Sequence, residues 1–248
     1  MKKLRLVTKI LIACVLPLLM LSFILLSVDL CSGDRAWLER EYRKLDVGAY
    51  TRMSNEDMVR AFMQMVDYMK GDAESMRVLV TVNGSSVEMY NEREIEHMED
   101  VRALYKGLTA AACFVFALAL AALILALVAF RPKQERKAVL TFASKAALIS
   151  FLSIFGFILI VGAWAALDFR SFWDALHIVF LDLESSTFDP AVSRMIRICP
   201  PELFFDMVIR IFALGLAACA LPALAGGAYL LKTKSRPRAK GVREPFSV

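Results

Sequence analysis

The sequence predicts an all-α membrane protein with four transmembrane helices and a small α+β extracytoplasmic cap between helices 1 and 2. Apolar residues make up 58% of the 248 residues, and the mean hydropathy is +0.55, which is more apolar than a soluble domain. Four runs lack any charged residue, and each is long enough as a helix to cross a hydrocarbon core of about 30 Å. These runs are Ile10–Val28, Leu108–Phe130, Ala146–Leu167 and Ile211–Leu231.

The distribution of charge predicts the orientation of these helices. The N-terminus, the short 131–145 connection and the C-terminal tail together carry fifteen basic residues and only two acidic ones. The other segments carry fifteen basic and twenty-three acidic residues. Because cytoplasmic segments are enriched in Lys and Arg, we expect a multi-pass protein of the cell membrane with both termini in the cytoplasm. The net charge of +5 therefore reflects membrane orientation and predicts no nucleic-acid partner.

The predicted organisation follows from the four runs and the segments between them. The first run has the basic start of a signal peptide, but it is long for one and no small-residue cleavage site follows, so we interpret it as an uncleaved anchor. Lipoprotein-type cleavage before Cys31 fits badly with the Asp29-Leu30 that precedes it. The expected regions are the N-terminus with transmembrane helix 1 (1–28), the cap (29–107), transmembrane helix 2 (108–130), a cytoplasmic loop (131–145), transmembrane helix 3 (146–167), a second extracytoplasmic segment (168–210), transmembrane helix 4 (211–231) and a basic cytoplasmic tail (232–248).

Two helices are expected at the start of the cap. Arg35–Lys44 has apolar residues at helical spacing, of which Trp37 and Tyr42 are either packed inside or anchors at the membrane interface. Ser54 has the sequence context of an N-cap, and Asp57 stands where a capping box reaches back to the cap residue.

The second of these helices should end at Gly71. It carries an apolar stripe that we expect to pack under the cap: Met58, Phe62, Met65, Val66 and Met69. The residues 76–82 and 85–90 flank Asn83-Gly84 and predict a β-hairpin. From Asn91 the pattern is helical and continuous into the second span.

The protein contains only two histidines, and both are expected beside the same membrane face. Glu94-x-x-His97 and Asp174-x-x-His177 each place a carboxylate three residues before the imidazole on one helical face. Such a carboxylate can fix the tautomer of the ring and leave its other nitrogen as a base. We therefore expect His97 and His177 to meet in one site, and a surface or helix-capping role is the alternative.

The same spacing also occurs in di-iron helical bundles, where two further carboxylates complete the site. The four spans contain none, although Glu92, Glu96, Asp100 and Glu184 remain as donors outside them. We predict no metal. The sequence contains no nucleophile elbow, no H-E-x-x-H and no P-loop.

Several of these features together resemble the lipoprotein intramolecular transacylase (Lit) family of Gram-positive bacteria. The shared features are the four-span layout, the second histidine after the third span, and three sequence stretches. The stretches are Asn91-Glu92-Arg93-Glu94-Ile95-Glu96-His97-Met98-Glu99-Asp100-Val101, Phe188-Asp189-Pro190 and Pro201-Glu202-Leu203-Phe204-Phe205. The resemblance covers nearly the whole chain. The stretch from His177 to Asp182 is less aromatic than the family pattern.

The resemblance implies an enzyme that moves the sn-2 acyl chain of a diacylglyceryl-modified cysteine to the α-amino group of that cysteine. The product is an N-acylated, lyso-form lipoprotein. The partners implied are diacylglyceryl-modified lipoproteins and membrane lipid. The family's catalytic histidines map onto His97 and His177, at the extracytoplasmic face.

The chemistry of this reaction is compatible with an imidazole pair. An α-amino group with a pKa near 8 needs a base with a pKa near 7 before it can attack an ester. Because an amide is more stable than an ester, we expect no cofactor. The supporting residues that we predict are Glu94 and Asp174, which would orient the histidines, and Arg93 and Asn91, which would bind oxygens of the substrate.

Other functions stay open from the sequence. A non-catalytic membrane assembly protein needs no paired histidines, and a metal-dependent membrane hydrolase would need ligands beyond them. A proton-coupled transporter is disfavoured, because its ionisable residues should lie inside the spans. Cys31 and Cys199 are both expected on the outer side, where a disulfide is chemically permitted.

Overall fold

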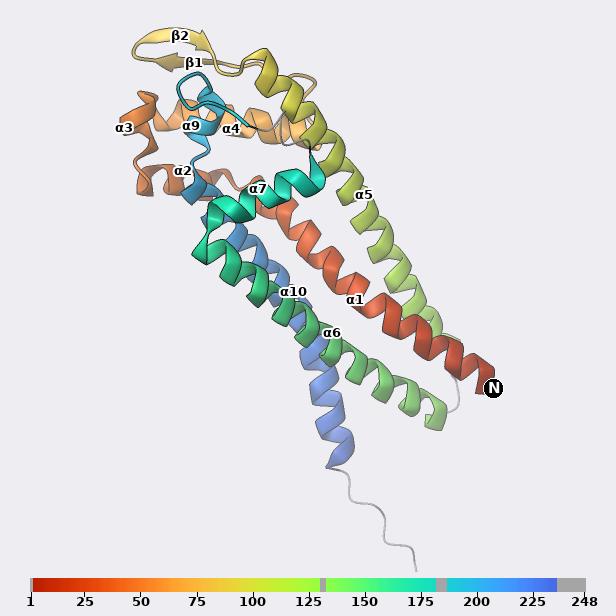
Figure 1. The fold of residues 1–248 in the computed structure, drawn as a ribbon. Helices are drawn as coiled ribbons and strands as arrows, with labels where there is room; N and C mark the ends of the chain where they lie inside the picture. Colours follow the sequence, from red (N-terminus) through yellow and green to blue (C-terminus); the bar gives the residue numbers. More distant parts are fainter. Residues whose placement is uncertain (1, 130–132, 182–186, 236–248) are drawn as a thin grey trace, which may run out of the picture.

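The computed structural model describes residues 2–129, 133–181 and 187–235 of the chain. Its elements in chain order are α1 (Lys2–Ser32), α2 (Arg35–Lys44), α3 (Val47–Thr51), α4 (Asn55–Lys70), β1 (Leu79–Val82), β2 (Ser85–Glu88), α5 (Glu92–Ala129), α6 (Lys133–Leu167), α7 (Phe169–Phe180), α9 (Arg194–Ile198) and α10 (Pro201–Lys234). Figure 1 shows the long helices α1, α5, α6 and α10 with the short elements gathered at one end. The predicted fold class is confirmed.

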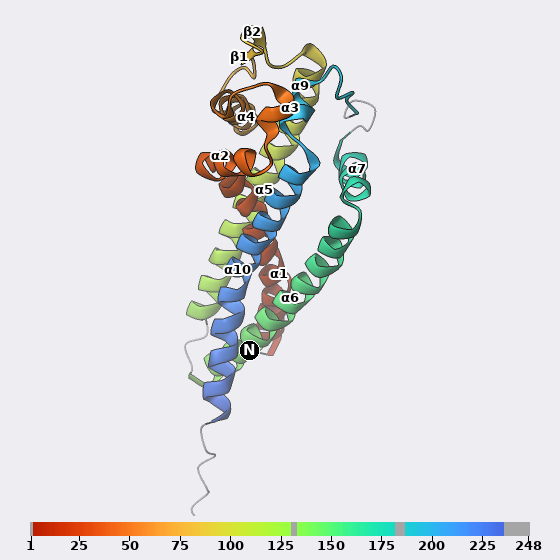
Figure 2. The ribbon, with the colours of Figure 1, turned by 90° about the vertical axis from the view of Figure 1, so that its left-hand side faces the viewer.

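The four long helices α1, α5, α6 and α10 are long and apolar enough to cross a membrane, and the protein is a multi-pass membrane protein. Each continues past its uncharged run into charged residues; α6, for example, begins at Lys133 and not at Ala146. Long charged side chains at helix ends reach the polar headgroup region, so such extensions cost little. α1 packs against α5, α6 and α10, and α6 packs against α10. Figure 2 shows α6 leaning away from the other spans toward the end that carries α7.

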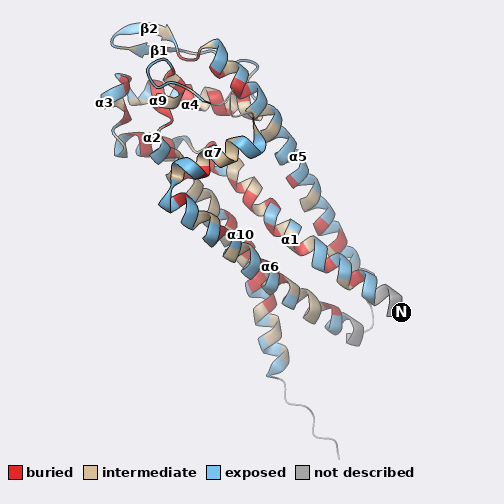
Figure 3. Cartoon of the chain, in the orientation of Figure 1, coloured by how far each residue is buried: buried red, intermediate tan, exposed pale blue. Residues whose placement is uncertain are grey.

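The cap, which we define as residues 35–91 together with α9, has an apolar core of its own. Residues of the predicted stripe, Met58, Phe62, Met65 and Val66, are buried in it. Tyr42 is also buried there, so its alternative role as an interfacial anchor is wrong. The core continues into the first turns of α10 through Leu203 and Met207. Figure 3 shows buried residues concentrated in α4 and α9, whereas the long helices expose much of their surface.

Local signals in the cap mostly predicted its elements. Ser54 Oγ accepts a hydrogen bond from the backbone N–H of Asp57 at 3.0 Å, and Gly71, with φ of 92°, caps the C-terminus of α4 as expected. The hairpin is antiparallel with Leu79 opposite Glu88, and Asn83-Gly84 forms the turn with both φ angles positive. The predicted return of Asp57 to the cap residue is wrong.

The Asp57 carboxylate accepts hydrogen bonds from Arg60 and from the backbone N–H of Thr81 instead. It thereby links α4 to the hairpin. The five-residue helices α3 and α9 were not predicted, because helices this short show no apolar period.

Ion pairs at the ends of the spans connect them to the cap. Arg210 of α10 pairs with Asp34, and its guanidinium lies 5.2 Å from the ring centroid of Trp37. Lys44 of α2 pairs with Asp206 of α10 at 2.6 Å. Near the end of α1, Asp29 pairs with Lys70 of α4 at 3.0 Å. The cap is thus attached to α1 and α10 at several points.

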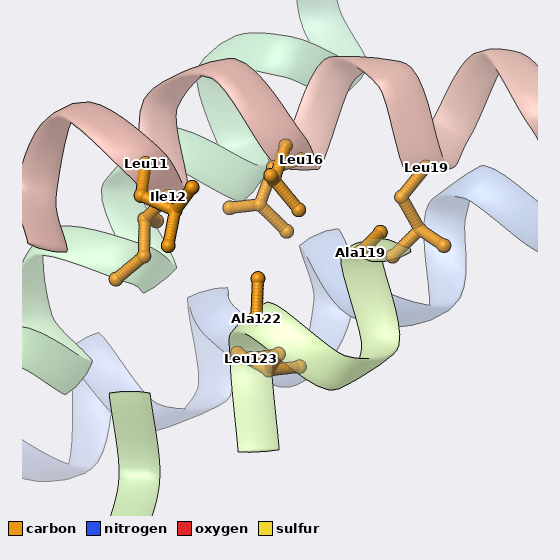
Figure 4. A pocket seen from close by; sticks show the side chains of 8 residues that line it. Leu11, Ile12, Leu16, Leu19, Ala119, Ala122 and Leu123 are labelled. Atoms are coloured by element: carbon orange, nitrogen blue, oxygen red, sulfur yellow. The ribbon is translucent and has the colours of Figure 1, made fainter. Parts of the chain in front are cut away.

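Cys31 and Cys199 are both buried and free, so the disulfide that the sequence permits is not formed. Figure 4 shows an apolar hollow between α1 and α5, within the membrane-spanning segments. It is lined by Leu11, Ile12, Val15, Leu16, Leu19, Ala119, Ala122 and Leu123. Ala119 follows His97 by twenty-two residues on α5, which is about 33 Å along a helix, so this hollow is remote from the histidines.

Candidate active site

His97 and His177 lie side by side at the cap end of the spans. His97 comes from α5 and His177 from α7. Their ring centroids are 6.0 Å apart, and the ring planes differ by 23°. The expectation that the two histidines meet is confirmed. Two imidazoles from separate helices therefore share one site.

The backbone of α7 fixes the tautomer of His177. The Asp168 side chain caps α7 by accepting a hydrogen bond from Ser171 N at 3.0 Å, and the helix starts directly after α6. Nδ1 of His177 lies 2.8 Å from the carbonyl oxygen of Trp173. Because a carbonyl can only accept, Nδ1 carries the hydrogen, and Nε2 of the neutral ring keeps its lone pair. Asp174 is exposed and is not the group that bonds Nδ1, so that predicted orientation is wrong.

His97 is in a drier environment than His177. Only 6% of its surface is exposed, and its buried Nδ1 has no hydrogen-bond partner among the described residues. The ring of Phe188 meets it edge-to-face with centroids 5.3 Å apart. His97 precedes Leu108, where the uncharged part of α5 begins, by eleven residues, or about 16 Å. It therefore lies above the membrane-spanning segment.

The pKa of His97 is lowered from 6.5 to about 4, first by burial and then by the nearby His177, while Asp100 acts in the opposite direction. At neutral pH the ring is uncharged. A neutral imidazole carries one N–H and can act as a hydrogen-bond donor.

Glu94 is fully buried, with 0% of its surface exposed, yet it does not bond His97. Its carboxylate accepts hydrogen bonds from Asn91 N at 2.7 Å, from Ser193 Oγ at 2.5 Å and from Met195 N at 3.0 Å. The Asn91 side chain in turn accepts from Glu94 N at 3.0 Å. Asn91 and Glu94 thus cap the start of α5 reciprocally. The prediction that Glu94 orients the ring of His97 is wrong, and the side chain of Asn91 serves as a helix cap.

Arg93 contacts the 188–195 segment, to which Glu94 is also hydrogen-bonded. Its guanidinium lies 5.5 Å from the ring centroid of Phe188, which places a cation over that ring. Phe188 therefore lies between Arg93 and His97. Arg93 is exposed, one turn above the histidine pair.

Aromatic side chains of α7 and α10 continue from His177 toward the end of α6. The ring of Trp173 lies 5.0 Å from that of His177 and stacks at 4.4 Å on Phe204. Phe169 follows, 5.7 Å from both Trp173 and Phe205. This row of rings is apolar and adjoins the histidines. It is the kind of surface that suits a hydrocarbon chain.

The di-iron alternative has no ligand set in the described ranges, where no three His, Cys, Asp or Glu side chains are grouped so as to hold a metal ion. Glu184, one of the donors considered for it, lies outside the described residues. Sequence reasoning missed Ser193 and the Trp173 carbonyl as partners of site residues. The motif around Phe188 was the only signal for the segment that contacts His97.

Comparisons with known proteins agree on one family. The family model described as lipoprotein intramolecular transacylase Lit matches residues 13–205. The in meso structure of the membrane-integral transacylase Lit from Bacillus cereus is similar with a TM-score of 0.69 at 12% identity, covering 95% of this chain and 100% of that one.

A structure of the same Bacillus cereus protein with one histidine replaced by alanine gives a TM-score of 0.67 at 13% identity, over 95% of this chain and 97% of that one. A structure of the Bacillus cereus protein with a histidine replaced by arginine gives a TM-score of 0.67 at 13% identity, over 94% of this chain and 95% of that one. A search of curated protein sequences finds no match.

Proposed function

Because the chain belongs to the lipoprotein intramolecular transacylase (Lit) family, we propose that it transfers the sn-2 acyl chain of a diacylglyceryl-modified cysteine to the α-amino group of that cysteine. The product is the N-acyl, lyso-form lipoprotein. The observation that carries the proposal is the pairing of the two histidines, with ring centroids 6.0 Å apart, at the head of an aromatic row.

His177 is the base in this proposal. Its Nδ1 is committed to the Trp173 carbonyl, so Nε2 is the nitrogen that takes a proton. His177 is only partly buried, whereas His97 sits where the charged form is disfavoured. The histidine that becomes an imidazolium during the reaction should be the one with better access to solvent.

His97 is the hydrogen-bond donor in this proposal. Burial keeps its imidazole neutral, and a neutral N–H can polarise the ester carbonyl without giving up a full charge. A donor that is already fixed in place stabilises the developing oxyanion with little reorganisation. The two histidines then differ in role because their surroundings differ.

The steps balance without a further reactant. The amine nitrogen attacks the ester carbonyl carbon while His177 takes its proton, and the new C–N bond forms. The C–O bond to the glycerol carbon then breaks, and the proton passes from His177 to the departing glycerol oxygen. Donor and acceptor belong to one molecule, so much of the rate gain comes from holding them in the reactive orientation.

The substrate would meet this site at an apolar surface on the outer side of the membrane. The aromatic row formed by Phe169, Trp173, Phe204 and Phe205 is our candidate for contact with the acyl chains. The charge distribution supports cytoplasmic termini, which puts the cap and the histidines at the extracytoplasmic face. Diacylglyceryl lipoproteins anchored in the outer leaflet would reach the site there.

The proposal is tested by tandem mass spectrometry of the N-terminal peptide of a reporter lipoprotein, in a host that lacks other N-acylating enzymes; fragmentation is needed because the product is an isomer of the substrate. Co-expression of the wild-type protein should convert the reporter to the N-acyl, S-monoacylglyceryl form. His97→Ala and His177→Ala should each lower conversion by roughly 100-fold or more, as loss of an acid or base group does. Each variant must be present in the membrane at the wild-type level.

Two outcomes contradict this proposal. A reporter that stays diacylated with a free amine, although the wild-type protein is well expressed, argues for a non-catalytic assembly role. Full conversion by both alanine variants would leave the transacylase function standing and remove the histidines from it.

A further inference from the structure

Glu94 joins two segments that are far apart in the sequence. Its carboxylate accepts a hydrogen bond from Asn91 N on its own helix and from two donors around the start of α9, Ser193 Oγ and Met195 N. Ser193 is itself 2% exposed, and its hydroxyl oxygen also accepts from Ile196 N at 3.2 Å. The start of α9 is thereby fixed to the turn of α5 that precedes His97.

A tight turn transmits this attachment to Phe188. The carbonyl oxygen of Asp189 accepts hydrogen bonds from Val192 N at 3.0 Å and Ser193 N at 2.8 Å. The Asp189 side chain accepts from Ala191 N at 2.8 Å. With both the backbone and the side chain of Asp189 engaged, residues 189–193 form a rigid turn. Anchoring Ser193 to Glu94 therefore also places Phe188.

Placed by this turn, Phe188 covers His97. Its ring centroid lies 5.3 Å from that of the imidazole and 5.5 Å from the guanidinium of Arg93, and the ring also packs against the cap core. His97 is 6% exposed, and its Nδ1 has no partner among the described residues, so this side of the imidazole is shielded from solvent. The shielding depends on a side chain held by Glu94 and Ser193.

We propose that Glu94 and Ser193 are positioning residues that hold Phe188 against His97, and that this contact excludes water from the acyl-transfer site. The inference rests on the proposed transacylase function. Its consequence is selectivity for the acceptor, since the amine of the lipoprotein and water compete for the same ester. Glu94 acts through Phe188 and makes no contact with the reacting atoms.

Loss of the shield should divert the reaction to hydrolysis. Water then takes the place of the amine, its oxygen attacks the ester carbonyl, and His177 takes the proton. The C–O bond to the glycerol breaks, and the proton passes to the glycerol oxygen. The products are a free fatty acid and a lyso-lipoprotein whose α-amine is unmodified, and this species differs in mass from the N-acyl product.

The test compares Ser193→Ala and Phe188→Ala with Ser54→Ala as the matched control. Ser54 and Ser193 both cap a helix through their hydroxyl groups, so both substitutions remove one cap of similar strength. Ser54 caps α4, and its hydroxyl accepts from Asp57 N within its own turn. Purified variants receive a diacylglyceryl lipopeptide, and tandem mass spectrometry measures the N-acyl lyso product, which is an isomer of the substrate, and the lighter free-amine lyso product. Thermal unfolding measures the stability of each variant.

Ser193→Ala and Phe188→Ala should slow N-acylation roughly 10- to 100-fold, the scale expected for small misplacements near a reacting centre. They should also raise the fraction of free-amine lyso product. Ser54→Ala should lose the stability of one helix cap, without the further loss that Ser193→Ala suffers from its hydrogen bond to Glu94, and should keep the wild-type product ratio. If Ser193→Ala fails to fold, Phe188→Ala decides alone, because Phe188 is only partly buried.

Unchanged rate and product ratio in the variants overturn the inference, provided that the wild type N-acylates the peptide. Slower N-acylation without free-amine lyso product also overturns it, as does an equal change of ratio in Ser54→Ala. A wild-type protein that makes neither product contradicts the proposed function itself, so the two failures are distinguishable.

Discussion

His97 and His177 are the same residue type in different surroundings. His97 is almost fully enclosed, next to Phe188, and its pKa is depressed. His177 is partly exposed and has one nitrogen tied to the Trp173 carbonyl. Unlike surroundings of two titratable groups are a common basis for separate acid and base roles. This difference is the reason for assigning the base to His177 and the donor to His97.

The depressed pKa of His97 predicts a pH dependence of stability. In the unfolded chain this histidine takes a proton below its ordinary pKa of 6.5, whereas the folded protein resists protonation down to about pH 4. Between these values protons favour the unfolded state, so the free energy of unfolding decreases as the pH falls. The melting temperature of the wild type should therefore drop more between pH 7 and pH 5 than that of His97→Gln.

Thermal unfolding of the detergent-solubilised proteins at several pH values measures this difference. Above pH 7 the two curves should run in parallel, since the group is neutral in both states there. Parallel curves below pH 7 as well would mean that His97 is accessible to protons in the folded protein.

At the residue scale, sequence predicted which groups meet but not how they are held. Two histidines near one membrane face were a sufficient signal for the pair. The carboxylates three residues earlier suggested partners, but a backbone carbonyl four residues before His177 bonds it instead. Glu94 bonds Ser193, which is ninety-nine positions away, and no local pattern indicates such a contact.

At the element scale, α5 is the element that connects the site to the membrane. It begins at Glu92, directly after the cap, and continues without interruption through the second span. Capping residues and the Asn83-Gly84 turn predicted the cap's longer elements, since these signals are local in sequence. The helices α3 and α9 owe their existence to burial of Val47, Met195 and Ile198 in the cap core, a tertiary effect.

The packing of α10 in the membrane depends on two glycines. A methyl group on Gly215 would lie 2.9 Å from Cγ1 and 3.0 Å from Cα of Ile24 in α1. One on Gly226 would lie 3.0 Å from Cα and from the carbonyl oxygen of Ser144 in α6. Small residues allow such close approach of helices in membranes.

Gly215→Ala should therefore lower the stability by about 1–3 kcal/mol, because the added methyl group meets backbone that cannot move away easily. Gly162→Ala is the matched control, since no heavy atom of the described structure lies within 4 Å of the added carbon. It should be neutral or stabilising by up to about 1 kcal/mol from helix propensity. Denaturant or thermal unfolding in one detergent compares them, and an equal effect of both substitutions would contradict this packing.

At the scale of the whole molecule, cap and spans are built as one unit. The cap core includes Leu203 and Met207 of α10, and ion pairs attach the cap to Asp29 and Arg210 at the ends of the spans. Arg210 of α10 pairs with Asp34, which is also the N-cap residue of α2 and accepts a hydrogen bond from Trp37 N. This ion pair therefore also positions the start of α2. The histidines lie where these two parts join.

The proposed orientation predicts which ends of the molecule a membrane-impermeant maleimide reaches. Ser85→Cys lies in the exposed hairpin, and Lys234→Cys lies at the exposed end of α10. In intact cells Ser85→Cys should be labelled and Lys234→Cys should not, whereas both should react after permeabilisation. The wild-type protein reports the background from its five native cysteines. If only Lys234→Cys is labelled in intact cells, the orientation of the protein is the opposite of the proposed one.

The central claim is an intramolecular transfer of the sn-2 chain to the α-amine. The most direct measurement uses two synthetic diacylglyceryl lipopeptides of different peptide mass, only one of which carries a deuterated sn-2 chain. Both are incubated together with the purified protein, and tandem mass spectrometry locates the deuterium in each product. We expect the deuterated chain on the α-amine of its own peptide and nowhere else. Deuterium on the other peptide, or an undeuterated sn-1 chain on the α-amine of the labelled peptide, would contradict the account.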